Sequence, residues 1–388
     1  MRHLLSIVIP TKNRQEYCLE AVKQILGLKM EEVQICIQDN SDEPVMGDLL
    51  KGIANENVIY NYHAGTLSFV DNFSEAISLA DGMYICMIGD DDGVLPNILG
   101  VVKMAYREHY DAVIPGLNSV YFWPSEHPIY QKAEQGYLCV AYLSAKKKDI
   151  NCFQGLDSLM EHAGQDYQAL DIPRIYHGIV KRETLLKIKN HTGVYFGGLT
   201  PDIYMSVVLC FVCKKVCRVG YPITVSGICP RSGSSDSATG KHTGELKDAP
   251  HFRGHDSYNW DEKAPAIYSV ESIWAETVLQ ALRDWEADEY YKKFRVDVLD
   301  GICMDKYPQF KEVIRKHAEK HGFSIQKVKI IGKKKKIEDF LKRCTGRICR
   351  RKNDVKKLYH VPDINSACNQ TMKEMYMKNI CIKAVKEN

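Results

Sequence analysis

The stretch MYICMIGDDDGVLP, residues 83–96, carries an apolar run straight into three adjacent carboxylates. The run 83–89 has the length and composition of a buried β-strand. Asp90, Asp91 and Asp92 follow it directly, and three neighbouring negative charges repel one another unless another group offsets them. The alternative is an Asp-rich solvated turn. We interpret the triplet as a candidate cation site, because ligands of open α/β sheets bind at the carboxyl ends of the strands.

Outward from this stretch, apolar strand-like runs alternate with segments of helical period. The sequence predicts strands at 4–10, 33–39, 57–63, 83–89 and 111–116. It predicts helices between them at 13–28, 68–82 and 95–109. Such alternation is typical of an α/β protein with a mostly parallel sheet. Beyond 116 the pattern loosens, with a strand and helix over 174–188 and a helix that begins at Thr200 and Pro201.

Composition is that of an ordinary globular protein, with 45% apolar and 26% charged residues in a chain of 388. The apolar start of the chain and the run 203–213 are both too short for a signal peptide or a membrane span. We therefore expect a cytoplasmic protein. The 14 cysteines are scattered. Cys210, Cys213 and Cys217 could suggest a metal, but their helical spacing in an apolar segment favours one packed helix face.

Charge is distributed unevenly along the chain. Residues 301–388 contain 23 Lys and Arg against 9 Asp and Glu, a balance of +14, so the remainder carries −11 of the net +3. A basic region of this kind suits an anionic membrane surface or an anionic acceptor, although a solvated lysine-rich helix surface explains it too. Aromatic residues are sparse among these cations, so we expect no nucleic-acid partner.

Three polar clusters lie where predicted strands end: PTKNR (10–14), DNS (39–41) and the Asp triplet. Parallel strands would bring them to one edge of the sheet. Thr11, Asn13 and Arg14 offer donors for a nucleotide or another anion. Carboxylates bind hard divalent cations, which leave positions open for phosphate oxygens. The sequence therefore predicts a site for a nucleotide and Mg²⁺ or Mn²⁺.

In these motifs the first 200 or so residues resemble the family 2 glycosyltransferases. The resemblance rests on SIVIPTKNR, QDNSDE, NFSEAISLADGMYICMIGDDDGVLP and FGGLTPD, in order and at the family's intervals. It implies a GT-A fold, that is, a Rossmann-like mixed, mostly parallel sheet flanked by helices, here with a C-terminal helical extension. We divide the chain into a GT-A domain (1–225), a flexible Gly/Ser-rich loop that is a candidate active-site lid (226–265), and a basic, mainly helical region (266–388).

The resemblance also implies roles for individual residues. Asp202 would be the catalytic base, although Pro201 stands where the family usually has Glu. Asp202 lies in the first turn of the predicted helix, so we expect the helix dipole to lower its basicity. Asp39 would hold the base of the nucleotide, and the whole predicted nucleotide site comprises Pro10, Thr11, Asn13, Arg14, Asp39, Asn72, Asp90 and Asp91.

Two registers are open for the family's D-x-D metal motif. Either 90–92 is the motif itself, or the family's D-x-D-D is aligned on its last two acids and Gly89 replaces the first. In both registers Asp91 or Asp92 would contact Mn²⁺ or Mg²⁺, and we rank Asp92 first. The family often adds a His; His242 is our choice, with His251 and His255 as alternatives, and the predicted ligands are Asp92, Asp91, Asp90 and His242.

The resulting expectation is an inverting, metal-dependent hexosyl- or N-acetylhexosaminyltransferase. It would move a sugar from a nucleotide-diphosphate donor, a UDP-sugar, to a saccharide or lipid-linked acceptor in surface polysaccharide biosynthesis. Residues 301–388 would contact the inner face of the membrane peripherally. The alternatives are a nucleotidyltransferase of sugar-1-phosphates, which usually needs a glycine-rich loop after the first strand, and an inactive nucleotide- or glycan-binding scaffold.

Overall fold

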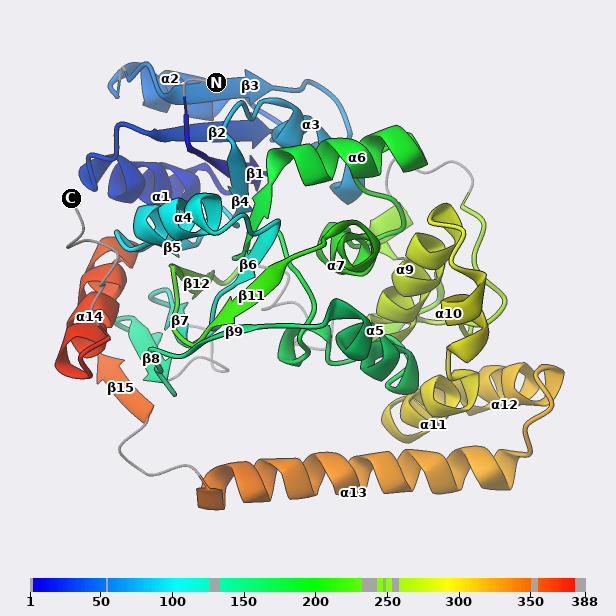
Figure 1. Ribbon diagram of the computed structural model, residues 1–388. Helices are drawn as coiled ribbons and strands as arrows, with labels where there is room; N and C mark the ends of the chain where they lie inside the picture. The colour runs from blue at the N-terminus through cyan, green and yellow to red at the C-terminus, as the bar shows by residue number, and fades with distance from the viewer. Residues whose placement is uncertain are drawn as a thin grey trace.

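The computed structural model describes residues 3–53, 55–125, 133–231, 243–246, 249–252, 258–349 and 355–380. Helices flank a central sheet built from the N-terminal part of the chain, and a group of C-terminal helices lies beside them (Figure 1). The predicted α/β class is confirmed.

The main sheet has eight strands in the order β3-β2-β1-β4-β10-β6-β11-β9. The first four run parallel, so their carboxyl ends share one edge, whereas β10 is antiparallel to both its neighbours. β11 is parallel to β6, and β9 closes the far edge antiparallel to β11. The strands are β1 (Leu5–Thr11), β2 (Val33–Asp39), β3 (Val58–Tyr62), β4 (Tyr84–Met87), β6 (Ala112–Ile114), β9 (Lys147–Asp149), β10 (Ile179–Lys181) and β11 (Val216–Val219).

Both faces of this sheet are covered, which explains why its central strands are continuous apolar runs. In β1, Ile7 and Ile9 pack with α1 and α4, whereas Val8 faces the opposite core with α3 and α7. Ser68 caps α3, as predicted, by accepting a bond from the backbone N–H of Asp71. The helices of this part are α1 (Gln15–Gly27), α2 (Val45–Lys51), α3 (Phe69–Ser78), α4 (Ile98–Arg107), α5 (Cys152–Glu161), α6 (Arg182–Thr192) and α7 (Pro201–Val212).

A second, five-stranded sheet was not predicted. Its order is β15-β8-β7-β12-β5, and α14 (Ile364–Met377) shares its core. Its strands are β5 (Gly93–Val94), β7 (Ser119–Phe122), β8 (Tyr137–Ala141), β12 (Thr224–Ile228) and β15 (Val355–Tyr359). β12 spans the predicted boundary between residues 225 and 226, and β15 and α14 belong to the predicted 266–388 region. The division into three regions stays a prediction.

The remaining C-terminal helices pack on one another and, through α9, against α7, so they share the core on that face of the main sheet. The long helix α13 lies on the outside of this group, at the lower edge in Figure 1. It crosses α11 at two glycines, Gly332 and Gly301. The helices are so close there that a Cβ on Gly332 would overlap the carbonyl of Gly301. No helix of the described residues is long and apolar enough to cross a bilayer. The elements are β13 (Thr243–Gly244), β14 (Tyr268–Ser269), α9 (Val270–Asp284), α10 (Asp288–Lys293), α11 (Val296–Lys306), α12 (Lys311–Lys320) and α13 (Ile325–Cys349).

The cysteine-containing segment 210–217 differs from the prediction in one respect. The prediction that the three cysteines share one helix face is wrong, because α7 ends at Val212 and Cys217 lies in β11. Cys210 and Cys217 are buried in two different cores, on opposite faces of the main sheet. Core packing is therefore the role of both thiols, as the apolar surroundings indicated.

Candidate active site

The acidic triplet forms the turn between β4 and β5, where the main sheet meets the second sheet. All three side chains are buried: the exposed fractions are 0% for Asp90, 4% for Asp91 and 1% for Asp92. A solvated Asp-rich turn is thereby excluded. Burying carboxylates is costly unless each one finds a charge partner or hydrogen-bond donors.

Asp90 is paired with residues from the end of β1, as the strand-end argument predicted. Thr11 donates its hydroxyl hydrogen to Oδ2 of Asp90 at 2.6 Å, and Nε of Arg14 donates to the same oxygen at 3.1 Å. Nη2 of Arg14 lies 2.7 Å from Oδ1 of Asp90, and Nη1 lies 3.8 Å from Oδ2 of Asp91. One guanidinium therefore spans two of the three carboxylates.

Asp91 and Asp92 are held by the second sheet. Backbone N–H groups of Cys229 and Gly227 donate to Asp91 Oδ2 and Asp92 Oδ1 at 2.9 and 2.7 Å. Trp123 donates its indole N–H to the backbone oxygen of Asp91 at 2.8 Å. Gly227 must be glycine here, because a Cβ would overlap that same backbone oxygen. The acidic turn is thus clamped between the two sheets.

Both oxygens of Asp92 already accept hydrogen bonds from the protein. Besides Gly227, the N–H of Gly89 donates to Oδ2 at 2.6 Å and the hydroxyl of Tyr176 donates to it at 3.2 Å. Nε2 of His177 lies 3.4 Å from the same oxygen. Among the described residues, Asp91 has the fewest side-chain partners of the three carboxylates, which makes it a better candidate for contact with a ligand than Asp92.

The structure explains the glycine at position 89. A Cβ on Gly89 would lie 2.6 Å from the hydroxyl oxygen of Tyr176 and 3.1 Å from oxygens of Asp91 and Asp92. Position 89 therefore has no room for a carboxylate while Tyr176 occupies this place. The acids of this turn are confined to residues 90–92.

The electrostatics of the triplet reflect burial and mutual repulsion. Burial raises the pKa of Asp90 to about 6; Arg14 counteracts this rise and Asp91 adds to it. Burial and the neighbouring charge of Asp91 raise the pKa of Asp92 well above its usual range. An added cation beside the triplet would favour the charged forms and lower both pKa values.

The carboxylate chemistry fits Mg²⁺ or Mn²⁺, but the protein alone does not complete a metal site. Among the described residues, no group of three or more His, Cys, Asp or Glu side chains is arranged to hold a metal ion. Arg14 fills the space beside Asp90, and Asp92 is engaged on both oxygens. A metal bound here would take Asp91 as its protein ligand and complete its shell with ligand oxygens and water.

Of the predicted histidines, His242 and His255 lie outside the described residues. His251 is described, and its ring packs 5.6 Å from that of Phe69 and 5.8 Å from that of Tyr268. Both are centroid distances.

The predicted nucleotide pocket gathers at the carboxyl ends of β1 and β2, where Thr11 pairs with Asp39 across the sheet. Asp39 is fully buried and accepts bonds from the N–H of Ser41 and the hydroxyl of Tyr60, at 2.9 and 3.1 Å. Pro10 is buried within β1.

Two amides complete this part of the site. Asn13 has a left-handed backbone, with φ of 56°, and donates its Nδ2 hydrogen to Asp42. Asn72, in α3, donates to the backbone oxygen of Thr11 at 3.3 Å. Oδ1 of Asn72 is buried and accepts no hydrogen bond from the described residues. An unsatisfied buried acceptor at a binding edge indicates a donor from a ligand or water.

Asp202 lies in the first turn of α7, as predicted, and is partly exposed. The hydroxyl of Tyr167 donates to its Oδ2. The expected lowering of basicity is wrong: burial raises the pKa of Asp202, and the bond from Tyr167 counteracts this rise only in part. Desolvation of the carboxylate therefore outweighs the favourable helix N-terminus.

A segment that the sequence did not single out, residues 165–177, contacts both acidic groups. Tyr167 binds Asp202, and Tyr176 binds Asp92. Between them, Arg174 is buried and donates to the backbone oxygens of Gln168 and Pro115, at 2.6 and 3.1 Å. Residues 165–173 have neither strand nor helix period, and the strand predicted from 174 begins only at Ile179. The contacts of the buried Tyr and Arg side chains are therefore found only in three dimensions.

His177, at the end of this segment, is a neutral partner of the acidic turn. Nδ1 of its ring lies 2.9 Å from the hydroxyl of Thr224 in β12. Burial, with the neighbouring Arg174, lowers the pKa of His177 to about 3. The ring therefore adds no positive charge beside Asp92 at neutral pH.

Comparison with known proteins finds similarity to one family over part of the chain. Residues 6–163 match the family model described as Glycosyl transferase family 2. The chain is 31% identical over 105 residues to the abequosyltransferase RfbV of Salmonella typhimurium, which covers 26% of this chain and 32% of that protein. It is 29% identical over 140 residues to a putative colanic acid glycosyl transferase, WcaA, of Escherichia coli, covering 34% and 50%.

A third curated relative, the glycosyltransferase GlyG of Streptococcus pneumoniae, is 25% identical over 120 residues, 30% of this chain and 39% of that protein. The chain thus spans between a third and a half of the length of these relatives. Among solved structures, S. aureus TarS 1–349 in complex with UDP-GlcNAc aligns with a TM-score of 0.46 at 12% identity, covering 83% of this chain and 76% of that chain.

Proposed function

Because this chain carries a family 2 glycosyltransferase domain, we propose that it is an inverting transferase that moves a sugar from a UDP-sugar to a hydroxyl group. The acceptor would be a saccharide or a lipid-linked saccharide. The reaction would belong to the biosynthesis of a surface polysaccharide. Two of the relatives, an abequosyltransferase and a putative colanic acid glycosyl transferase, support this process.

One observation carries the proposal: the buried acidic turn and its guanidinium lie at the carboxyl edge of the parallel strands. Arg14 reaches both Asp90 and Asp91 there, and Thr11 and Asp39 end the two adjacent strands. This edge is where open α/β sheets bind nucleotides. A nucleotidyltransferase, in contrast, usually holds its triphosphate with a glycine-rich loop after the first strand, and residues 10–18 contain no glycine.

In the nucleotide-sugar site, Asp39 would accept hydrogen bonds from the nucleotide base. Oδ1 of Asn72 would accept a hydrogen bond from another group of the nucleotide sugar. Asp39 is held in place by Ser41 and Tyr60, so its orientation is set before the donor arrives. Arg14 would offer a positive charge to the diphosphate. To do so it would give up its contact with Asp91, which is longer than its contact with Asp90.

A divalent cation, when bound at Asp91, supplies positive charge that neutralises the diphosphate leaving group. Asp90 would keep Arg14 oriented toward this position, and Asp92 would fix the backbone of the turn through Gly89 and Gly227. The three acids therefore have three separate roles, and the role of metal ligand moves from Asp92 to Asp91.

On the acceptor side, Asp202 would act as the general base. Its carboxylate takes the proton of the acceptor hydroxyl while that oxygen bonds to the anomeric carbon, and the bond from this carbon to the diphosphate oxygen breaks with its electron pair. The raised pKa of Asp202 suits this role, because a more basic carboxylate is a better proton acceptor. Tyr167 orients the carboxylate through its hydroxyl.

The test is a panel of nucleoside-diphosphate sugars, offered with Mn²⁺ or Mg²⁺ to the full chain, with released nucleoside diphosphate as the readout. Asp202→Asn should lower acceptor-dependent release about a hundredfold or more, the usual effect of losing a general base. Asp157→Asn is the matched control, because the side chain of Asp157, in α5, is half exposed and pairs with Lys293.

Other outcomes would contradict the proposal. Nucleotide binding without release from any donor would indicate a scaffold. Turnover of a nucleoside triphosphate with a sugar-1-phosphate would indicate a nucleotidyltransferase. Equal release by wild type and Asp202→Asn would remove Asp202 as the base while leaving the transferase reaction in place.

A further inference from the structure

Helix α13 has two unlike faces. Its inner face packs against α11 through Val328, Gly332 and the stem of Lys335, all of which are buried. On the opposite side lies an apolar stripe, defined here as Ile330 and Ile337, with exposed fractions of 66% and 58%. Phe340, 63% exposed, lies at the edge of this stripe. In the described part of the chain, no other element covers this stripe.

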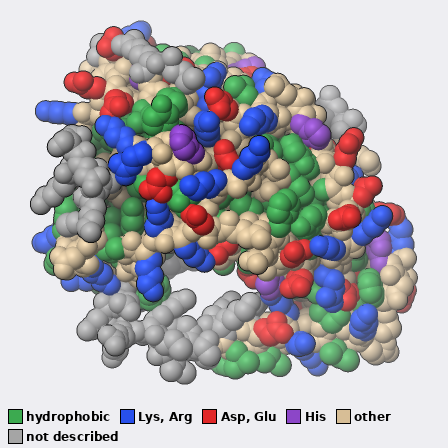
Figure 2. Space-filling model, viewed as in Figure 1, with side chains coloured by type: hydrophobic (Ala, Val, Ile, Leu, Met, Phe, Trp, Pro, Cys, Tyr) green, Lys and Arg blue, Asp and Glu red, His purple; other side chains and the backbone are tan. Residues whose placement is uncertain are grey.

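Lysines surround the apolar stripe. Residues 325–338 contain six lysines and one glutamate, and all the lysines except Lys335 are exposed. Lys333 and Lys334 lie on the same side of the helix as Ile330 and Ile337, given 100° of rotation per residue. At the lower right edge of the molecule in Figure 2, where Figure 1 places part of α13, hydrophobic side chains lie among Lys or Arg and Asp or Glu side chains.

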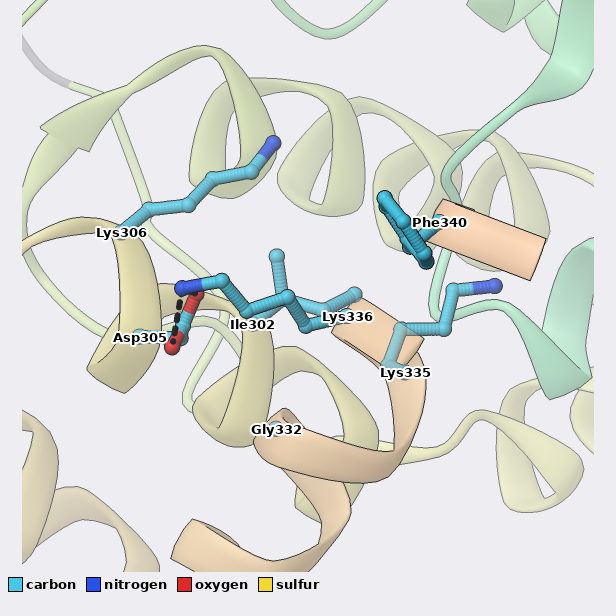
Figure 3. A pocket seen from close by; sticks show the side chains of 7 residues that line it. All are labelled: Ile302, Asp305, Lys306, Gly332, Lys335, Lys336 and Phe340. Atoms are coloured by element: carbon cyan, nitrogen blue, oxygen red, sulfur yellow. Dashed lines mark hydrogen bonds and ion pairs between the residues drawn. The ribbon is translucent and has the colours of Figure 1, made fainter. Parts of the chain in front are cut away.

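A cavity of about 290 Å³ opens beside the stripe, between α11 and α13. Phe340 lines it together with three lysines, Lys306, Lys335 and Lys336 (Figure 3). Lys336 contacts Asp305 across the cavity at 3.0 Å, and Lys306 contacts Glu271 at 2.5 Å. Positive side chains therefore outnumber the single acid, Asp305, in the lining of this cavity.

We propose that this face of α13 docks on an anionic phospholipid bilayer, with the apolar stripe inserted at the level of the headgroups and the lysines against lipid phosphates. An exposed apolar stripe flanked by cations is the pattern of helices that lie in a membrane interface. Charge decides between a bilayer and a second copy of the chain. Two copies joined face to face would bring like-charged lysines together, whereas anionic lipid is complementary to them.

This inference is independent of the proposed reaction, since docking requires neither donor nor turnover. The experiment is co-sedimentation of the full chain with vesicles of phosphatidylcholine alone and of phosphatidylcholine mixed equally with phosphatidylglycerol. We expect binding to the anionic vesicles that weakens as salt is raised. Ile330→Ser with Ile337→Ser should lower the binding constant about tenfold or more, because both side chains lose apolar burial.

A matched double variant controls for surface changes in general. The control variant carries Val45→Ser and Leu49→Ser, at two apolar side chains of α2 that are 48% and 38% exposed. It should bind vesicles as wild type does. Lys333→Gln with Lys334→Gln should lower binding to anionic vesicles about tenfold and leave the weak binding to phosphatidylcholine unchanged. Equal thermal midpoints for all variants would show that the fold is intact.

Two results would overturn the proposal. One is equal vesicle binding by wild type and the Ile330/Ile337 variant. The other is a concentration-dependent dimer, seen by sedimentation velocity, that the same variant converts to monomer while wild type fails to bind vesicles. The second result would assign the stripe to a second copy of the chain.

Discussion

The two sheets meet at the acidic turn, but they are assembled in different ways. In the main sheet, β1, β2 and β4 come from the first 90 residues and lie side by side with simple parallel registers. The second sheet joins β7 and β8 to β12 and to β15, near the end of the chain. The hydroxyl of Tyr121, for example, donates to the backbone oxygen of Val361, 240 residues away.

The two sheets therefore have different roles at the site. The main sheet contributes functional side chains, whereas the second sheet holds the acidic side chains in position. The main sheet delivers Thr11, Arg14 and Asp39 to one edge. The second sheet contributes mainly backbone N–H groups, those of Gly227 and Cys229, which fix the carboxylates that face it. Breaking the second sheet should therefore misplace the acids without removing any of them.

Two variants share the largest expected effect, and the first is Gly227→Ala, which forces a Cβ into the backbone oxygen of Asp91. We expect a loss of about 3 kcal/mol in the free energy of unfolding, measured with urea, because backbone has to shift. Gly27→Ala is the control: a Cβ at Gly27 meets no atom within 4 Å. If both variants unfold at the same urea concentration, the clamp between the sheets is not rigid.

Arg14→Met tests the main-sheet side of the turn. It leaves the buried carboxylates of Asp90 and Asp91 without their cation, which should cost about 3 kcal/mol of unfolding free energy at pH 8. Asp90 has its folded pKa raised from 3.8 to about 6, so its contribution to stability is fully present below about pH 4 and is lost as the pH rises through 6.

The penalty of Arg14→Met should consequently shrink between pH 8 and pH 5, where Asp90 is protonated and carries no charge. Urea unfolding at both pH values measures it. Arg315→Met removes an exposed arginine that pairs with Glu312 and Glu319 on α12, and it should leave the midpoint unchanged. A penalty that is constant with pH would show that Asp90 is not the group Arg14 compensates.

The smallest effect is expected for Tyr121→Phe, which removes one long-range hydrogen bond of the second sheet. The carbonyl of Val361 is left without this donor, at a cost of about 1 kcal/mol in unfolding free energy. The nucleotide affinity of this variant should equal that of wild type, because the residues of the proposed nucleotide site belong to the main sheet. A weakened nucleotide affinity would show that the second sheet reaches further into the site.

Local sequence patterns were enough to predict the α/β class, the parallel strands and the convergence of the three polar clusters. These depend on local properties, namely apolar period and the polarity of residues that follow a strand, as in the run from Tyr84 to Asp90. The same local pattern supported the family resemblance, and the family match over residues 6–163 bears it out.

The partners of each acidic side chain, in contrast, depend on contacts between distant segments. Tyr176 fills the space beside Gly89, and Gly227 reaches Asp92 from a strand that lies 135 residues further along the chain. Burial reversed the expected basicity of Asp202. Such effects depend on which distant segments meet and on how much water they exclude, and neither is encoded in a periodicity that extends over a few residues.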